Sequence, residues 1–245
     1  MAFTVHAVMP GVWHIVDCMG VCMTLLEGEN AAMLVDTGYG IEDVGDFMRH
    51  MTDLPLTVFL THNHHDHAMG ARCFPETYML EADMADWRMF TDDKMRRRVL
   101  TQAIGKNLPV DEKTFLAGEI PLPKVMKPGV IDLGGLTAEI IEAPGHTPGS
   151  AVVYVPERKL LLSGDDWNPC TWLFFPQALG LREYRSNMRG IQQLPFEKVL
   201  CPHREALYDR WMFDDFFNAL TDGNLRAAEP VNCLLYTSPS PRDCS

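Results

Sequence analysis

The pattern of apolar and polar positions predicts strands and helices that fall into two groups. Strands are expected where apolar residues alternate with polar ones or run together over a few positions, and helices where they recur every third or fourth position. In the first group the predicted strands cover residues 12–16, 21–26, 32–35, 57–60 and 77–80, and helices are predicted at residues 41–51 and from residue 68 onward. In the second group the predicted strands cover residues 130–133, 137–142, 151–155, 159–162 and 198–200, and the predicted helices cover residues 184–194 and 206–220.

An insertion at residues 81–125 separates the two groups. Charged and apolar residues are mixed from residue 81 to residue 100, and this part is predicted to be helical. Prolines at positions 109, 121, 123 and 128 then break the chain into a loop or short strands. We expect the insertion to cover one side of the functional site.

The two groups share a coarse internal repeat. A strand ending at Asp36 is followed by a helix and by a strand that leads to His62. In the second group a strand leads to Asp165, and a helix and a strand then lead to His203. Two such halves, packed sheet on sheet with their helices outside, would bring these four side chains to one edge.

The stretch directly after strand 57–60 carries the strongest chemical signal in the chain. It contains His62, His64, His65, Asp66 and His67, at the end of a strand where open α/β sheets usually place their chemistry. Imidazole and carboxylate groups together bind zinc or iron. Two residues apart on an extended segment, His62 and His64 can face one ion, while Asp66 and His67 can turn toward a second. The competing interpretation is a histidine-rich surface loop without a metal.

Three downstream segments argue against a plain surface loop, because each places one ligand-type residue beside a predicted strand. These residues are His146 in Ala-Pro-Gly-His-Thr-Pro-Gly-Ser, Asp165 in Leu-Ser-Gly-Asp, and His203 in Leu-Cys-Pro-His. Together with the Leu-Val-Asp-Thr-Gly segment at Asp36, and in this chain order, residues 12–203 resemble the metallo-β-lactamase superfamily. The resemblance implies an α/β fold, a four-layer αββα sandwich of two mixed sheets with helices outside.

The resemblance also implies roles for the individual residues. It assigns His62, His64 and His146 to one metal, and Asp66, His67 and His203 to the other, with Asp165 bridging the two. In the family the position of Asp36 holds the metal-binding loop by hydrogen bonds, although turn statistics alone explain an aspartate before Thr37 and Gly38 equally well. His65 occupies a variable place in the motif.

The expected activity is hydrolysis of a small ester, thioester or lactone by a metal-bound hydroxide. Two zinc ions per chain are the expected cofactor, with iron or manganese as alternatives, and Asp66 and Asp165 are the expected catalytic carboxylates. The alternative is a mononuclear iron persulfide dioxygenase of the same fold, which fills only one of the two metal sites. A metal-binding protein without catalytic activity is a weaker third interpretation.

Net charge and hydropathy narrow the class of partner. The formal net charge is −12, so neither nucleic acid nor an anionic membrane is expected as a partner. No apolar run is long enough to span a bilayer and no signal peptide is visible, so a cytoplasmic location and a small-molecule substrate are expected. The oligomeric state stays open.

An aromatic segment at residues 166–176 follows Asp165 and is a candidate pocket wall. Runs of this kind are usually core, but Pro169 and Pro176 indicate an irregular loop, and loops beside a site tend to line it. We therefore predict that Trp167, and secondarily Trp172, forms a hydrophobic wall for the substrate.

The C-terminal stretch is expected to be foreign to the fold. Residues 233–245 resemble the translation of a transposase adapter used in sequencing libraries, and serine and proline suddenly dominate there. Residues 1–232 are accordingly expected to form a single domain, and the natural C-terminus beyond Asn232 stays unknown.

Overall fold

The two predicted groups of strands form two separate β-sheets. The structure, a computed structural model, describes residues 3–173 and 175–227. The first sheet has seven strands in the order β1-β2-β3-β4-β5-β6-β7. These strands are β1 (Thr4–Met9), β2 (Val12–Val16), β3 (Cys22–Glu27), β4 (Ala32–Val35), β5 (Leu56–Phe59), β6 (Tyr78–Met79) and β7 (Lys124–Val125).

The second sheet has six strands in the order β13-β12-β11-β10-β9-β8. These strands are β8 (Gly129–Asp132), β9 (Thr137–Glu142), β10 (Ala151–Val155), β11 (Leu160–Leu162), β12 (Lys198–Leu200) and β13 (Tyr208–Asp209). Both sheets are mixed, because antiparallel neighbours adjoin the parallel pairs β4–β5 and β11–β12.

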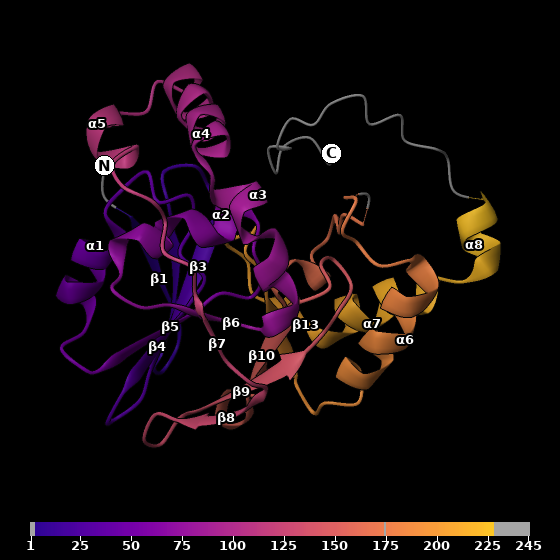
Figure 1. The fold of residues 1–245 in the computed structure, drawn as a ribbon. Coiled ribbons are helices and arrows are strands. Elements are labelled where there is room, and N and C mark those ends of the chain that lie inside the picture. Colours follow the sequence, from indigo (N-terminus) through magenta and orange to yellow (C-terminus); the bar gives the residue numbers. More distant parts are fainter. Residues whose placement is uncertain (1–2, 174, 228–245) are drawn as a thin grey trace.

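Helices cover the outer faces of both sheets, which makes the molecule a four-layer αββα sandwich (Figure 1). The α-helices are α1 (Val44–Met51), α2 (His65–Ala68), α3 (Trp87–Thr91), α4 (Asp93–Gly105), α5 (Glu112–Phe115), α6 (Leu181–Ile191), α7 (Arg210–Ala219) and α8 (Asp222–Ala227). Short 3-10 helices are η1 (Met69–Cys73), η2 (Glu81–Asp86), η3 (Pro156–Arg158) and η4 (Gly164–Asp166). The expected fold class is confirmed.

Apolar side chains fill the three spaces between the four layers. Between the sheets, Val35 and Phe59 of the first sheet pack in one cluster with Val153 and Leu162 of the second. On the outer face of the first sheet, alternate strand residues pack against Val44 and Met48 of α1. On the outer face of the second sheet, strand residues pack against α6 and α7. Strands buried on both faces explain the continuous apolar runs in the sequence.

The structure contains the predicted repeat of strand, helix and strand in each half, and this repeat brings the strand ends together. In one half, β4 and β5 are parallel neighbours with α1 between them in the chain, and in the other half β11 and β12 are parallel neighbours joined through α6. Parallel neighbours end at the same edge of a sheet. Asp36, His62, Asp165 and His203 therefore follow strands that end at one edge of the sandwich.

Two predicted helices differ from the structure and one strand was not predicted, each for a local reason. The helix predicted over residues 81–100 is divided into η2, α3 and α4, because the side chain of Asp92 accepts a hydrogen bond from the Met95 amide and starts a new helix there. The helix predicted over residues 206–220 begins only at Arg210, because Tyr208 and Asp209 pair with β12 as an edge strand. Strand β1 was not predicted, and its residues are exposed or half-buried, so no buried face marks it.

Two further expectations concern the C-terminal stretch and membrane-spanning helices. The adapter-like stretch 233–245 lies outside the described residues. Among the helices of the described part, none combines the length and the apolar character needed to cross a membrane.

Candidate metal centre

All seven predicted ligand residues lie together at one edge of the sandwich. The histidine-rich stretch follows β5 and continues into α2, His146 lies in the β9–β10 loop, Asp165 lies in η4, and His203 follows β12. Within the described residues, three groups of side chains offer ligand atoms that lie within 4.8 Å of one another. They are His62 with His64 and His146; His62 with His67 and Asp165; and Asp66 with His67 and His203.

The first of these groups, here called the three-histidine set, joins both halves of the molecule. The ring centroid of His62 lies 4.7 Å from the centroid of His64 and 4.9 Å from the centroid of His146. The Nδ1 atom of His64 lies 2.9 Å from the Nε2 atom of His146, although the two residues are 82 positions apart. Three imidazole nitrogens thus converge on one small volume, which is a donor set suited to zinc.

The second set consists of Asp66, His67 and His203. Oδ2 of Asp66 lies 3.8 Å from Nε2 of His67 and 3.7 Å from Nε2 of His203. This set has one carboxylate and two imidazoles, so it also offers nitrogen and oxygen ligands of the kind that zinc and iron accept.

Asp165 lies between the two sets. Its Oδ2 atom is 3.5 Å from Nε2 of His67 and also 3.5 Å from Nε2 of His146, and its carboxylate comes within 3.1 Å of Nε2 of His203. One carboxylate therefore faces nitrogens of both sets, as the bridging prediction requires.

Hydrogen bonds at Nδ1 turn three of the histidines so that their Nε2 atoms face the centre. Nδ1 of His67 donates to Oδ2 of Asp36 at 2.9 Å, and Nδ1 of His146 donates to the backbone carbonyl of Trp172 at 2.7 Å. Nδ1 of His62 lies 3.0 Å from the hydroxyl of Thr61. Ligand histidines commonly use their second nitrogen in this way, which sets the tautomer and the ring orientation.

Asp36 reaches the metal-binding loop through more than His67. Its Oδ1 atom accepts hydrogen bonds from the Thr61 amide at 2.8 Å and from the Thr61 hydroxyl at 3.0 Å. Asp36 has a backbone φ of 66°, in the left-handed region that aspartate enters more readily than most residues. Its geometry agrees with the predicted role of holding the loop.

Two ligand-type nitrogens at the centre have no hydrogen-bond partner among the described residues. They are Nε2 of His62 and Nε2 of His67, and both are buried. Leaving a buried donor or acceptor unpaired costs about 1–3 kcal/mol each. Cations bound at this centre would satisfy these atoms, so the side chains fit the metals that the fold implies.

Burial and charge divide the site into a neutral part and a charged part. Burial, followed by the neighbouring imidazoles, lowers the pKa of His62 and His64 well below the ordinary value. Burial acts in the same direction on His67, but the carboxylates of Asp165, Asp36 and Asp66 raise its pKa well above the ordinary value. Burial opposes ionisation of Asp66, yet its histidine neighbours bring its pKa to about 2. Neutral imidazole and ionised carboxylate are the forms that ligate metals.

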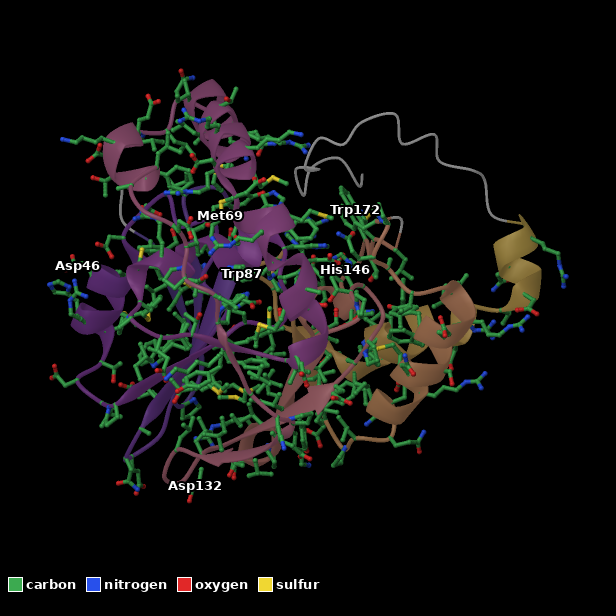
Figure 2. The ribbon with its side chains drawn as sticks, viewed as in Figure 1. Asp46, Met69, Trp87, Asp132, His146 and Trp172 are labelled. Atoms are coloured by element: carbon green, nitrogen blue, oxygen red, sulfur yellow. The ribbon has the colours of Figure 1, made fainter. Side chains whose placement is uncertain are left out.

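The structure differs from the prediction that Trp167, in the aromatic segment at residues 166–176, forms a pocket wall. This side chain is 1% exposed and packs against Tyr208 and Phe213, with ring centroids 5.5 and 5.7 Å away, in the cluster between the second sheet and α7. The structure thus places Trp167 in the core instead of at a pocket wall, because the start of the segment turns under α7. Trp172 is half-buried and lies near His146 (Figure 2).

Two neighbours of the ligands were not predicted. Asp166 accepts a hydrogen bond from the amide of His146 at 2.9 Å, and burial raises the pKa of its carboxyl well above the ordinary value. Its position directly after Asp165 was an available signal. Phe90 of α3 packs on His64 with the ring centroids 4.4 Å apart, and nothing in the pattern of the insertion marked it.

Comparison with known proteins decides the family. Residues 16–203 match the family model of the metallo-β-lactamase superfamily, which is more than half of the chain. The chain belongs to the metallo-β-lactamase superfamily. The matched range contains all seven ligand-type residues and Asp36, so the resemblance seen in the motifs is confirmed.

Relatives of this superfamily member are distant in sequence. An acyl-coenzyme A thioesterase of Gallus gallus, MBLAC2, is 26% identical over 202 residues, which cover 73% of this chain and 70% of the relative. A metallo-β-lactamase from Pontibacter korlensis is 16% identical with a TM-score of 0.65, covering 90% of this chain and 100% of that protein.

Two further solved structures support the same fold. A β-lactamase domain protein from Burkholderia ambifaria is 18% identical with a TM-score of 0.65, covering 91% of this chain and 74% of that protein. The protein TTHA1623, solved in a di-iron-bound form, is 21% identical with a TM-score of 0.56 and covers 81% of this chain and 94% of its own. Similarity at this level shows the shared fold and leaves the substrate to other arguments.

Proposed function

We propose that this member of the metallo-β-lactamase superfamily is a two-metal hydrolase that cleaves a small acyl substrate, with a thioester preferred over an ester or a lactone. One observation carries the proposal: both ligand sets are complete and both face the carboxylate of Asp165. His62, His64 and His146 would hold one ion, and Asp66, His67 and His203 the other. When bound, the two ions would polarise the substrate carbonyl and supply a nucleophilic water near neutral pH.

Two carboxylates of the protein would offset the charge of the two ions and orient a water beside them. Asp165 and Asp66 bring two negative charges, and Asp165 supplies an oxygen to each set. Asp66 has its second carboxylate oxygen, Oδ1, on the side of His65, 3.7 Å from Nδ1 of that residue. The other oxygen, Oδ2, faces His67 and His203, so an ionised Asp66 would hold an ion there and orient a water beside it. These contacts support the proposed catalytic role of both carboxylates.

Two arguments favour a thioester. A thiol has a pKa of about 8.5, so a thiolate leaves without first receiving a proton. An alcohol is far less acidic, and its departure needs more help from a positioned acid. The thioesterase named above, similar over 73% of this chain, independently points to the same bond.

The alternative of a mononuclear iron persulfide dioxygenase requires only one set. The presence of Asp66, His67, Asp165 and His203 at mutual ligand distances supports two ions, and zinc is the proposed metal with iron or manganese as alternatives. The proposed substrate is a small molecule, and the proposed location is the cytoplasm.

The test is reconstitution followed by a substrate panel. Protein stripped with a chelator is reloaded with zinc, iron or manganese, and bound metal is counted by mass spectrometry. Acyl-coenzyme A thioesters, simple aryl esters, lactones, a phosphodiester and a glutathione persulfide are then offered. We expect two ions per chain and the highest kcat/KM with a thioester, and Asp165→Ala serves as the inactive control. Two bound ions without hydrolysis of any acyl substrate would refute the proposal, and one iron with oxygen uptake on the persulfide would establish the alternative.

A further inference from the structure

A carboxylate outside the metal-binding motifs connects the two loops that carry the three-histidine set. Asp83 lies in η2, at the start of the insertion, and is 1% exposed. Its Oδ1 atom accepts a hydrogen bond from the Gly149 amide at 2.6 Å. Its Oδ2 atom accepts hydrogen bonds from the Thr147 hydroxyl at 2.7 Å and from the Asn63 amide at 3.2 Å.

The partners of Asp83 are neighbours of metal-type histidines in the chain. Asn63 stands between His62 and His64, and Thr147 directly follows His146. Asn63 also returns a hydrogen bond, because its side-chain amide donates to the backbone carbonyl of Asp83 at 3.0 Å. One buried carboxylate thus joins the loop after β5 in the first sheet to the β9–β10 loop in the second sheet.

The side chain of Asp83 packs directly against the backbone of Gly149 in the β9–β10 loop. A Cβ atom added at Gly149 would lie 2.6 Å from Cγ and Oδ1 of Asp83, so only glycine allows this approach. Burial raises the pKa of the Asp83 carboxyl, and the hydrogen bonds from Thr147, Gly149 and Asn63 act against that rise. All the donors to its carboxylate among the described residues are neutral. Such a carboxylate is costly to bury, and it is stable only while these three donors stay in place.

We infer that Asp83 is a positioning residue that holds the loop of His62 and His64 and the loop of His146 at the spacing that the three-histidine set needs. It acts on this set more than on Asp66, His67 and His203, because its partners Asn63 and Thr147 stand next to the three histidines of the set in the chain. The ring of His67 is held by Asp36 instead, and no hydrogen-bond partner of Asp83 among the described residues adjoins His203. The inference rests on the proposed metal centre, and it adds a residue of the insertion that sets the affinity of one half of that centre.

The test measures the affinity of the two ions separately. Metal-free protein is titrated with Zn²⁺ against a chromophoric chelator, and the variants His146→Ala and His203→Ala identify which binding step belongs to which set. In Asp83→Asn one acceptor oxygen becomes an amide donor that faces the Asn63 amide. We expect the step lost in His146→Ala to weaken by about 10- to 100-fold, the range for residues that orient ligands, while the other step is unchanged.

Two matched comparisons separate positioning from simple loss of stability. Thr147→Val removes the hydroxyl that Asp83 binds and should weaken the same step, whereas Thr147→Ser keeps the hydroxyl and should restore it. Asp17→Asn changes another buried carboxylate, one that accepts backbone amides of Met19, Gly20, Val21 and Tyr39 and joins no ligand loop. It should leave both steps unchanged even if it lowers the melting temperature.

The experiments distinguish failure of the positioning role of Asp83 from failure of the proposed hydrolase function. Equal weakening of both steps in Asp83→Asn, or a lower melting temperature with both affinities intact, would overturn the positioning role. If the wild type binds two ions but hydrolyses no acyl substrate, the proposed function fails while the titration still decides on Asp83. If the wild type binds no ion at all, both fail together.

Discussion

The Nδ1 atom of His67 lies 2.9 Å from the Oδ2 atom of Asp36, across 31 positions of the chain. Asp36 follows β4 and His67 lies in α2 beyond β5, so the parallel pairing of these two strands is what brings them together. The contact leaves Nε2 of His67 directed at Asp165, 3.5 Å away. A carboxylate that touches no predicted substrate thus decides which nitrogen of His67 faces the metal centre.

Replacing Asp36 by Asn should weaken metal binding without unfolding the protein. The amide nitrogen of Asn would oppose the Nδ1–H group of His67 and favour the wrong tautomer, whereas Asn tolerates the positive φ at this position. We expect about 10- to 100-fold weaker binding of the ion held by His67, measured by chelator competition. An unchanged affinity would show that the hydrogen bond does not set the tautomer.

Replacing Asp165 by Ala should remove at least one ion. The carboxylate faces nitrogens of both sets, and its loss leaves two cations without a shared negative charge. Metal supplies several kcal/mol of transition-state stabilisation, so kcat/KM should fall by more than about 100-fold. Metal content by mass spectrometry and the thioester assay check this, and wild-type values for both would contradict the bridging role.

Replacing Gly70 by Ala should destabilise the protein and loosen the metal-binding loop. A Cβ atom there would lie 2.1 Å from the carbonyl oxygen of Thr37, which cannot move freely because the Thr37 amide and hydroxyl both bind the carbonyl of His67. Overpacking of this kind costs about 1–3 kcal/mol of unfolding free energy. The measurement is chemical denaturation of the metal-free protein.

Gly190→Ala is the matched control for that substitution. Gly190 lies within α6, and an added Cβ would have no heavy atom within 4 Å outside its own helix and chain neighbours. Alanine in a helix interior is more stable than glycine by about 0.5–1 kcal/mol, so this variant should gain stability. Equal effects of the two substitutions would mean that the contact with Thr37 is unimportant.

The two tryptophans of the aromatic segment should respond in opposite ways. Trp167→Ala removes a buried side chain from the cluster under α7 and should cost about 3–5 kcal/mol of unfolding free energy, with the ligand residues left in place. Trp172→Ala keeps the carbonyl that binds His146, and loss of an apolar substrate contact should lower kcat/KM by about 10- to 100-fold. Full activity in the Trp172 variant would move the pocket wall elsewhere.

The unfolding free energy should depend on pH through Asp17. Burial raises the pKa of this carboxyl from 3.8 to about 6, against the opposing hydrogen bonds from backbone amides. Since the folded state holds the proton more tightly than the unfolded state, the contribution of Asp17 to stability is greatest below pH 4 and is lost as the pH rises to about 6. Compared with Asp17→Asn, the metal-free wild type should lose about 2 kcal/mol between about pH 4 and pH 7. A difference that does not change with pH would place the pKa of Asp17 near its ordinary value.

Much of the metal centre could be predicted because its residues follow strands with clear patterns. The strands before Asp36, His62, Asp165 and His203 are short apolar runs, and a run of that kind predicts a buried strand from neighbouring residues alone. The repeat of strand, helix and strand then predicts parallel pairs, and parallel strands end at the same edge. Local information therefore sufficed for the fold class and for where the site lies.

Other features depend on contacts between segments far apart, and the sequence could not predict them. Trp167 and Trp172 stand five positions apart in one aromatic run, and only the packing of α7 sends one into the core and leaves the other beside His146. Asp83 lies in an insertion whose pattern marks no site. It meets Asn63 and Thr147 because two sheets stack face to face there.

The sequence by itself determined which residues end the strands, which side chains can bind metal, and the class of fold. The tertiary structure alone decided which nitrogen of each histidine faces the centre, which carboxylate holds the loops, and which aromatic residue is core. The physical reason is the range of each signal. Apolar periodicity records which face of a single element is buried, whereas hydrogen bonds such as His67 to Asp36 and Thr147 to Asp83 exist only after distant elements have packed.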